Sequence, residues 1–323
     1  MSQMTRRTFV RTAAAGAAAL ASTSLPRGRA RARAAELPKP KFKLNLNVGQ
    51  VGVRATPMEA VALAKKHGYG SVTPMAWAMG RMSDEQMAEL AAAMRKAGLV
   101  WGASGIGPFF DADEQRFKAK RERIAKAAKL LQRAKVTRCF TWVPPGSKTR
   151  TYRANFRLHV KRTREVGKLL ADHGLRIGLE YLGTKTLVLK SKYPFVQTLA
   201  EMKELTEEVG LNNVGLALDS WHWFQAGDTE EDIASLTNRQ AVTADICDAP
   251  AGIERHRMPD SPRKLPCTTG VIDLKPFLTG LVKIGYDGPL GTEPFDKTLR
   301  TLGTDKAMTV ATDAMKKAMA LIE

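Results

Sequence analysis

The chain has 323 residues, 44% of them hydrophobic and 26% charged, and it carries a formal net charge of +19. This length and composition suit one large soluble domain or two small ones. Every apolar run is shorter than the roughly 18 residues that a transmembrane helix needs, which excludes such a helix. The cysteines, Cys139, Cys247 and Cys267, match no zinc or redox spacing, and their odd number argues against a disulfide framework.

The first 35 residues differ from the rest, because they contain seven Arg and no acidic residue. Arg6 and Arg7 precede an Ala-rich apolar stretch at 13–21, and a small-residue site follows at Ala32-Arg33-Ala34. This pattern is typical of an export signal, and the paired Arg resembles a bacterial twin-arginine signal. We expect residues 1–35 to direct export to the periplasm or another exported location, and 36–323 to form the mature domain. A disordered basic N-terminus is the alternative.

Without those seven Arg the chain still carries a charge of +12. Such a charge would attract anionic substrates, anionic glycans or nucleic acid. However, Lys and Arg are spread over helical segments such as 118–135, where they are mixed with Glu and Ala. This mixing favours a solvated face.

Strand-like and helix-like segments alternate after the leader. Candidate strands cover 43–48, 71–73, 100–104, 138–143, 176–181, 214–219, 242–247 and 289–293. Helical patterns cover 57–67, 84–97, 111–134, 153–173, 196–209, 229–236, 274–284 and 304–321. Eight such units predict a single (β/α)₈ TIM barrel. The alternative is a doubly wound open sheet, for which the Gly-rich segment 102–107 is a weak phosphate-loop candidate.

Short signals mark the helix ends. Gly follows five of the helical patterns, which predicts left-handed C-terminal caps at Gly68, Gly98, Gly174, Gly210 and Gly285. Ser83 with Gln86 predicts a capping box, and Asp111 is a polar start for the third long helix.

Four acidic residues stand at the ends of the last four strands: Glu180, Asp219, Asp245 and Glu293. An unpaired buried charge costs several kcal/mol, and four converging carboxylates repel each other unless a cation lies between them. In a TIM barrel these four residues form an arc around one half of the mouth. The pattern therefore predicts a divalent metal site with oxygen ligands, rather than four separate salt bridges.

Other polar residues are expected near the same mouth. His222 follows Asp219 by three residues and could bind metal, donate to a substrate hydroxyl or shuttle protons. The long segment 248–273 joins the seventh strand to its helix, and long loops of this kind usually form the rim of an active site. Trp142 and Trp221 are among the aromatic residues at strand ends, where apolar faces of a sugar would stack.

Several motifs resemble the xylose-isomerase-like (β/α)₈ barrels, which include sugar isomerases, ketose 3-epimerases, inosose dehydratases and related apurinic endonucleases. The matching segments are 178–180, 218–222, 244–250, 270–273 and 285–295, and the resemblance covers 43–322. It departs from the family at Asp245, where the family usually has His, and at Cys267, which stands where the family loop often has Gly.

The resemblance implies one divalent ion bound by Glu180, Asp219, Asp245 and Glu293. Because Asp245 makes the ligand set harder, Mg²⁺ or Mn²⁺ is favoured. The resemblance also implies that Glu180 and Glu293 form an acid–base pair. The substrate would be contacted by His222 and by one or more of Arg255, Arg257 and Arg263.

The expected function is an exported, metal-dependent isomerase or epimerase that acts on a sugar or keto-sugar by removing a proton next to a carbonyl. A dehydratase or lyase, and a degenerate barrel that only binds sugar, are the alternatives. The endonuclease members use more His ligands than this chain offers, so no nucleic-acid partner is expected. No membrane partner is expected after export, and the sequence leaves the oligomeric state open, a homo-oligomer included.

Overall fold

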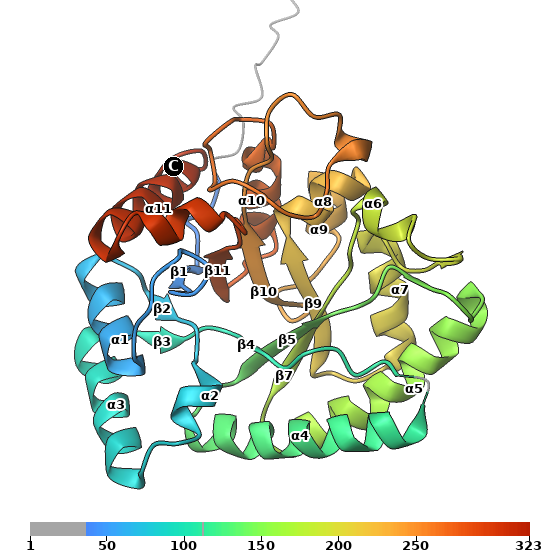
Figure 1. The fold of residues 1–323 in the computed structure, drawn as a ribbon, viewed down its shortest axis with the longest axis horizontal. Coiled ribbons are helices and arrows are strands. Elements are labelled where there is room, and N and C mark those ends of the chain that lie inside the picture. Colours follow the sequence, from blue (N-terminus) through green and yellow to red (C-terminus); the bar gives the residue numbers. More distant parts are fainter. Residues whose placement is uncertain (1–36, 112) are drawn as a thin grey trace, which may run out of the picture. The chain divides into compact units, whose positions relative to one another are not determined.

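A computed structural model describes residues 37–111 and 113–323 of the protein (Figure 1). The expected export signal lies outside these residues and stays a prediction. Within the described ranges, no helix is both long enough and apolar enough to span a bilayer.

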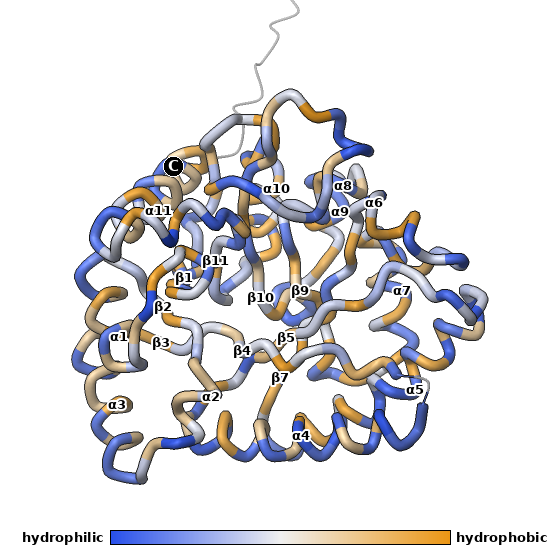
Figure 2. Tube along the Cα trace, viewed as in Figure 1, coloured by the Kyte–Doolittle hydropathy of each residue, from blue (hydrophilic) through white to orange (hydrophobic). Residues whose placement is uncertain are grey.

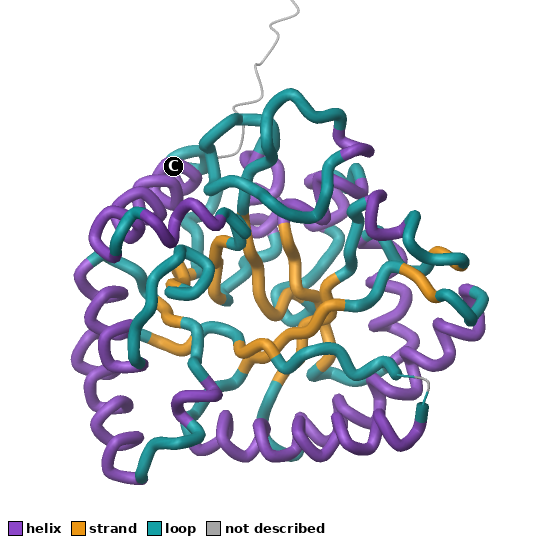
Figure 3. Tube along the Cα trace, in the orientation of Figure 1, coloured by secondary structure: helices purple, strands orange, loops and turns teal. Residues whose placement is uncertain are grey.

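A parallel sheet curls around the centre of the described chain, and the helices lie outside it (Figure 3). Its strands are β1 Lys43–Leu46, β2 Ser71–Val72, β3 Val100–Trp101, β4 Ser104–Gly105, β5 Arg138–Trp142, β7 Arg176–Glu180, β9 Val214–Asp219, β10 Ala241–Ile246 and β11 Pro289–Thr292. Their order is β3-β2-β1-β11-β10-β9-β7-β5-β4. The two ends of this order, β3 and β4, are separated in sequence only by Gly102 and Ala103. They therefore share one of the eight strand positions of the barrel, which we call staves, and the third stave is interrupted between them. The predicted TIM barrel is confirmed.

The break in the third stave has a local cause inside the barrel. Asn45 on β1 faces the interior, where its Oδ1 accepts a hydrogen bond from Ser71 Oγ at 3.1 Å and its Nδ2 donates to Thr73 Oγ1 at 2.8 Å. A Cβ atom at position 102 would collide with the Asn45 side chain. Glycine at this point lets the stave pass over the polar cluster.

The helices surround the sheet in the order that the sequence predicts. They are α1 Pro57–Lys66, α2 Ala76–Met79, α3 Asp84–Ala97, α4 Glu114–Arg133, α5 Tyr152–Ala171, α6 Lys185–Val188, α7 Leu199–Val209, α8 Ser220–Ala226, α9 Glu230–Ala234, α10 Leu274–Lys283 and α11 Thr304–Met319. Two 3₁₀ turns, η1 Arg255–Arg257 and η2 Lys297–Thr301, and an antiparallel pair, β6 Gly146–Ser147 with β8 Tyr193–Pro194, complete the fold. The sequence did not predict α2, α6, α8 or the small β6–β8 pair, all of which are short segments without a full hydrophobic period.

The predicted caps are mostly confirmed. Ser83 and Gln86 form the expected capping box, and all five predicted glycines have a positive φ between 65° and 78°. The predicted start of α4 at Asp111 is wrong. Asp113 Oδ1 accepts a hydrogen bond from Arg116 N at 2.7 Å, so the helix begins at Glu114.

The apolar faces of the helices pack against the outer face of the sheet (Figure 2). The long outer helices α3, α4, α5, α7 and α11 bury their apolar residues and keep polar residues toward solvent, and Figure 2 shows them as mixed orange and blue coils. The core therefore lies between sheet and helices, which leaves the carboxyl ends of the strands free to carry polar groups.

Candidate active site

The four predicted acids come from adjacent staves at one mouth of the barrel. Glu180 ends β7, Asp219 ends β9, Asp245 is the penultimate residue of β10, and Glu293 follows β11. Asp245 is level with Asp219 on one side and with Gly291 on the other. A Cβ atom at position 291 would collide with the Asp245 carboxylate, so glycine provides the space that this side chain occupies.

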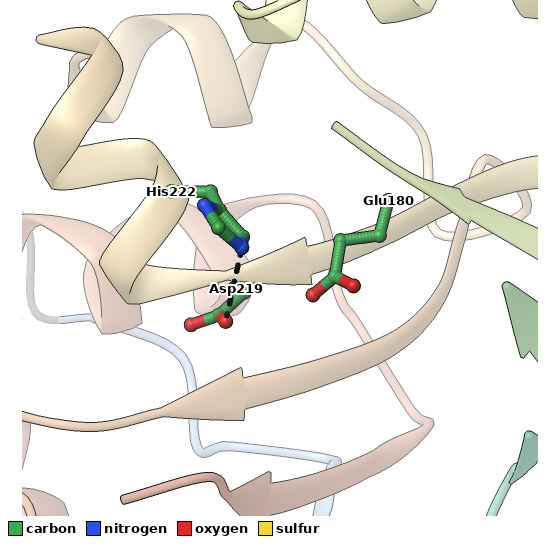
Figure 4. Close-up of side chains that lie close together, drawn as sticks. All are labelled: Glu180, Asp219 and His222. Carbon is green, nitrogen blue, oxygen red and sulfur yellow. Dashed lines mark ion pairs between the residues drawn. The ribbon is translucent and has the colours of Figure 1, made fainter. Parts of the chain in front are cut away.

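Glu180, Asp219 and His222 lie closest together (Figure 4). Each offers a ligand atom, and these three atoms lie within 4.8 Å of one another. His222 reaches the group because α8 begins directly after β9, with the Asp219 side chain accepting from Trp221 N at 2.9 Å as an N-cap. The prediction that His222 stands beside the carboxylates is confirmed in its placement.

Asp245 and Glu293 are placed differently. Among the described residues neither belongs to the group within 4.8 Å, although the sequence predicted all four acids as one ligand set. Glu293 accepts hydrogen bonds from Gln50 Nε2 at 2.8 Å and from Arg263 Nη1 at 3.1 Å. No hydrogen bond to a described residue is made by the carboxylates of Asp245 and Glu180.

Arg263 was expected to contact the substrate, and its position among the carboxylates is the main feature that the sequence did not predict. Its side chain is 1% exposed, and its guanidinium lies among the acids rather than toward a substrate pocket. Nη1 donates to Asp219 Oδ2 at 2.6 Å and to Glu293, while Nη2 donates to Asp260 Oδ1 at 3.2 Å and lies 3.3 Å from His222 Nε2. One fixed cation therefore joins residues from four segments of the chain.

Backbone hydrogen bonds and two aromatic rings hold Arg263 in position. Arg263 N donates to Pro294 O at 2.9 Å, and the next residue, Lys264, pairs with Asp248 through two backbone hydrogen bonds of 2.8 Å. The guanidinium carbon lies 5.2 Å from the Trp221 ring centroid and 4.6 Å from that of Phe295. Two aromatic faces thus hold a cation that is already committed to the carboxylates.

The electrostatics of the mouth follow from burial and like charge. Burial, together with Glu293 and Asp219, raises the pKa of Glu180 well above its usual range. Burial also raises the pKa of Asp245 to about 7 and that of Glu293 to about 8. Burial and the nearby Arg263 lower the pKa of His222 well below its usual range, so its imidazole is neutral. The protonated forms of several acids are therefore favoured unless another cation binds.

The other predicted substrate contacts separate into two groups. Arg255 and Arg257 lie on the exposed turn η1, where Arg257 pairs with Glu254 and neither touches the carboxylates. Trp221 is fully buried, and its Nε1 donates to Thr184 Oγ1 at 2.9 Å, so it supports the site and offers no face for stacking. Trp142 is 42% exposed at the end of β5 and is level with Glu180. Of these four residues, only Trp142 is therefore placed to meet a ligand at the mouth.

A cavity of about 660 Å³ lies at the same mouth, against the loops that follow β1 and β2 and against β4 itself. Asn47, Arg54, Thr73, Trp77 and Ser104 are among the residues that line it. The loop that carries Asn47 also carries Gln50, which donates to Glu293. The cavity is thus linked to the carboxylates by one hydrogen-bonded side chain, and it can hold a molecule of sugar size.

The sequence matches the xylose isomerase-like TIM barrel family over residues 61–320. The chain belongs to this family. A curated inosose isomerase from Halalkalibacterium halodurans is 26% identical over 152 residues, which cover 46% of this chain and half of that protein. The chain therefore matches only about half the length of this relative.

Solved structures agree with the family assignment. A xylose isomerase domain protein from Alicyclobacillus acidocaldarius superposes with a TM-score of 0.73 at 28% identity, covering 87% of this chain and 99% of that one. The IOLI protein, solved with a bound zinc atom, superposes with a TM-score of 0.74 at 20% identity over 87% of this chain and 99% of its own. At that identity the second likeness shows the fold alone.

Proposed function

We propose that the protein is a divalent-metal-dependent sugar isomerase or epimerase in which Glu180 removes a proton next to a carbonyl. The observation that carries this proposal is the state of Glu180. Its carboxylate is partly buried at the mouth of the barrel, has no hydrogen-bond partner among the described residues, and has a pKa held well above its usual range. A carboxylate with a raised pKa and a free acceptor oxygen is suited to general base catalysis.

Glu293 suits the second proton transfer. It lies across the mouth on the segment after β11, and its pKa of about 8 keeps a proton available near neutral pH. Gln50 and Arg263 fix its two oxygens in place. A proton taken by Glu180 from one side and returned from Glu293 on the other would invert or relocate a hydrogen on a sugar carbon.

The donor set fits a divalent cation. Glu180 and Asp219 supply carboxylate oxygens, and His222 is neutral, as a metal ligand must be. These three residues would hold the ion, and the unpartnered Asp245 would add negative charge beside it. When bound, the ion would polarise the carbonyl and hydroxyl oxygens of the substrate. The excess of buried acid over the single Arg263 cation supports this assignment.

The sugar-modifying role is further supported by the family and by the inosose isomerase relative. The cavity gives a substrate of that size a place to bind and is lined by the exposed Trp77, while Trp142 stands exposed at the end of β5, level with Glu180. Because both rings stand at the mouth, an apolar sugar face could stack there while its hydroxyls meet the acids.

The test is hydrogen exchange at the substrate carbon in deuterated water, followed by NMR over a panel of keto-sugars and inososes in the presence of Mg²⁺, Mn²⁺ or Zn²⁺. Glu180→Gln keeps the oxygen near the metal but cannot accept the proton. We expect exchange and turnover to fall by roughly 10²–10⁴-fold with substrate affinity little changed. Glu207→Gln, which alters an exposed glutamate on the outer helix α7, should leave both rates at the wild-type value.

Each other outcome is informative. Equal exchange in wild type and Glu180→Gln would show that Glu180 is not the base. Loss of water from the substrate instead of isomerisation would identify the protein as a dehydratase. No exchange and no conversion with any substrate or metal would favour a barrel that only binds sugar.

A further inference from the structure

The positive charge of the described chain is concentrated on two neighbouring helices. α4 contains eight Lys or Arg and two acidic residues, and α5 contains six and one. These two helices, 20 residues each, carry +11, whereas residues 37–323 together carry +13. The rest of the barrel therefore carries a net charge close to zero.

On α5 the exposed charges form a single line. Arg153, Arg157, Lys161, Arg164 and Lys168 are spaced by three or four residues, so they share one face of the helix over about 22 Å. Among the residues that the structure describes, only Arg164 of these five has an acidic partner, Glu208 Oε1 at 3.1 Å. We call these five residues the α5 stripe. Like charges at this spacing destabilise a helix by about 0.2–0.5 kcal/mol per pair, so the stripe does not serve the stability of the fold.

The α5 stripe borders a groove. A cavity of about 390 Å³ is lined by Phe156, Arg157, Val160, Lys161, Arg164, Glu165 and Glu208. Phe156 and Val160 give it an apolar floor, and three basic residues stand along it. The far side belongs to α7, which carries four Glu and one Lys.

We propose that this groove and the α5 stripe bind a linear acidic polysaccharide, a polymer of sugars that carry carboxylate or sulfate groups. Regularly spaced cations on one face match a chain whose anionic groups recur along its length. The apolar floor matches the aliphatic face of a sugar ring, and the second basic helix, α4, extends the positive field on the side away from α7.

The surroundings of the stripe argue against wider or base-stacking polyanions. A bilayer or a nucleic-acid duplex laid over α5 would also meet the four Glu of α7. Single-stranded nucleic acid is usually held by exposed aromatic rings, on which the bases stack. In the described ranges the exposed large apolar side chains lie elsewhere: Met58, Trp77, Val100, Trp142, Leu189 and Ile253. A narrow chain of charged sugars can follow α5 alone, and both acids that line the groove have a basic partner, Glu208 in Arg164 and Glu165 in Arg162.

The test is binding of the full-length protein to polygalacturonate, measured by calorimetry at several salt concentrations. Fully methyl-esterified pectin is the matched neutral ligand. We expect saturable binding to polygalacturonate alone, with an affinity that falls steeply as salt is raised. Replacing Arg153, Arg157, Lys161 and Lys168 by Gln should weaken binding at least tenfold, which is about 1.4 kcal/mol.

A control variant removes the same charge elsewhere. Lys275, Lys306, Lys316 and Lys317 lie exposed on α10 and α11, and their replacement by Gln should change the affinity less than about twofold. Far-ultraviolet circular dichroism confirms that both variants are folded. Equal weakening in both variants, absence of binding by the wild type, or tighter binding to an oligothymidine or to phosphatidylglycerol vesicles than to polygalacturonate would overturn the proposal.

Discussion

Arg263 is the residue on which the candidate site depends most. Its guanidinium is the one positive charge that contacts Asp219 and Glu293 in the described chain, and it is nearly inaccessible to water. A buried ion pair that loses one partner leaves an uncompensated charge, which costs about 3–5 kcal/mol. The arginine thus holds the acids together and limits the charge that a metal ion must neutralise.

Removal of this cation should be measurable in the metal-free protein. We expect Arg263→Met to lower the free energy of unfolding by about 3–5 kcal/mol in urea titrations with a chelator present. Arg263→Lys should lower the free energy of unfolding by a smaller amount, because a single ammonium cannot contact Asp219, Asp260 and His222 at once.

Added Mn²⁺ or Mg²⁺ should restore more stability to Arg263→Met than to the wild type, because the variant has more negative charge to neutralise. Arg257→Met, on the exposed turn η1, is the control and should change the free energy of unfolding by less than about 0.5 kcal/mol. If the two substitutions cost the same, the proposed role of Arg263 is wrong.

At the scale of elements, the segment between β10 and α10 is organised by a single acid. Asp248 accepts hydrogen bonds from the backbone N–H groups of Thr269 and Gly270 at 2.8 Å, of Ile272 at 3.0 Å and of Ala249 at 2.8 Å. Burial alone would raise its pKa, but these donors outweigh burial and lower it. By binding residues near the other end of the segment, Asp248 holds its two ends together. The part of the segment that carries Arg263 is thereby kept over the mouth of the barrel.

Loss of the anchor should therefore affect the site from a distance. In Asp248→Asn one carboxylate oxygen becomes an amide nitrogen, so some of the four backbone donors lose their acceptor at about 1–3 kcal/mol in total. We expect faster amide hydrogen exchange at Thr269, Gly270 and Ile272 and a reduced turnover. Glu254→Gln, an exposed change in the same segment, should alter neither, and unchanged exchange in Asp248→Asn would contradict the anchoring role.

The sequence was informative about elements and less so about side chains that meet across the mouth. The alternation of strand-like and helix-like segments, with glycine at helix ends, predicted the eight staves and their helices, because these signals are local. The role of Arg263 could not be predicted, because Arg255, Arg257 and Arg263 have the same charge in the same segment. What separates them is the pairing of Lys264 with Asp248, a contact between residues 16 positions apart. Gln50 was missed for the same reason, since its partner Glu293 lies 243 residues away.

At the scale of the whole molecule, the acids make stability depend on pH. The unfolded chain releases the Asp245 proton near pH 3.8, whereas the folded protein holds it until about pH 7. The folded state therefore binds more protons in this window, and the free energy of unfolding of the metal-free protein should fall as pH rises through it. Glu293 extends the effect to about pH 8.

Urea titrations at pH 5 and pH 8, each with chelator and with Mn²⁺, test this expectation. Metal should stabilise the protein more at pH 8 than at pH 5, because fewer protons then compete with it for the acids of the mouth. Asp245→Asn should flatten the pH dependence of the metal-free protein and stabilise it at pH 8 by on the order of 1–3 kcal/mol. A rise in stability with pH in the metal-free wild type would refute the assignment of these shifts.

The pairing of β1 with β11 also determines when the barrel can close during synthesis. Lys43 and Leu44 are level with Pro289 and Leu290, so the first stave stays open along one edge until nearly the whole chain has left the ribosome. An open edge of this kind is free to pair with another nascent chain. Until β11 emerges, the edge of β1 thus stays available to other newly made chains, and this is the period in which a chaperone would protect it.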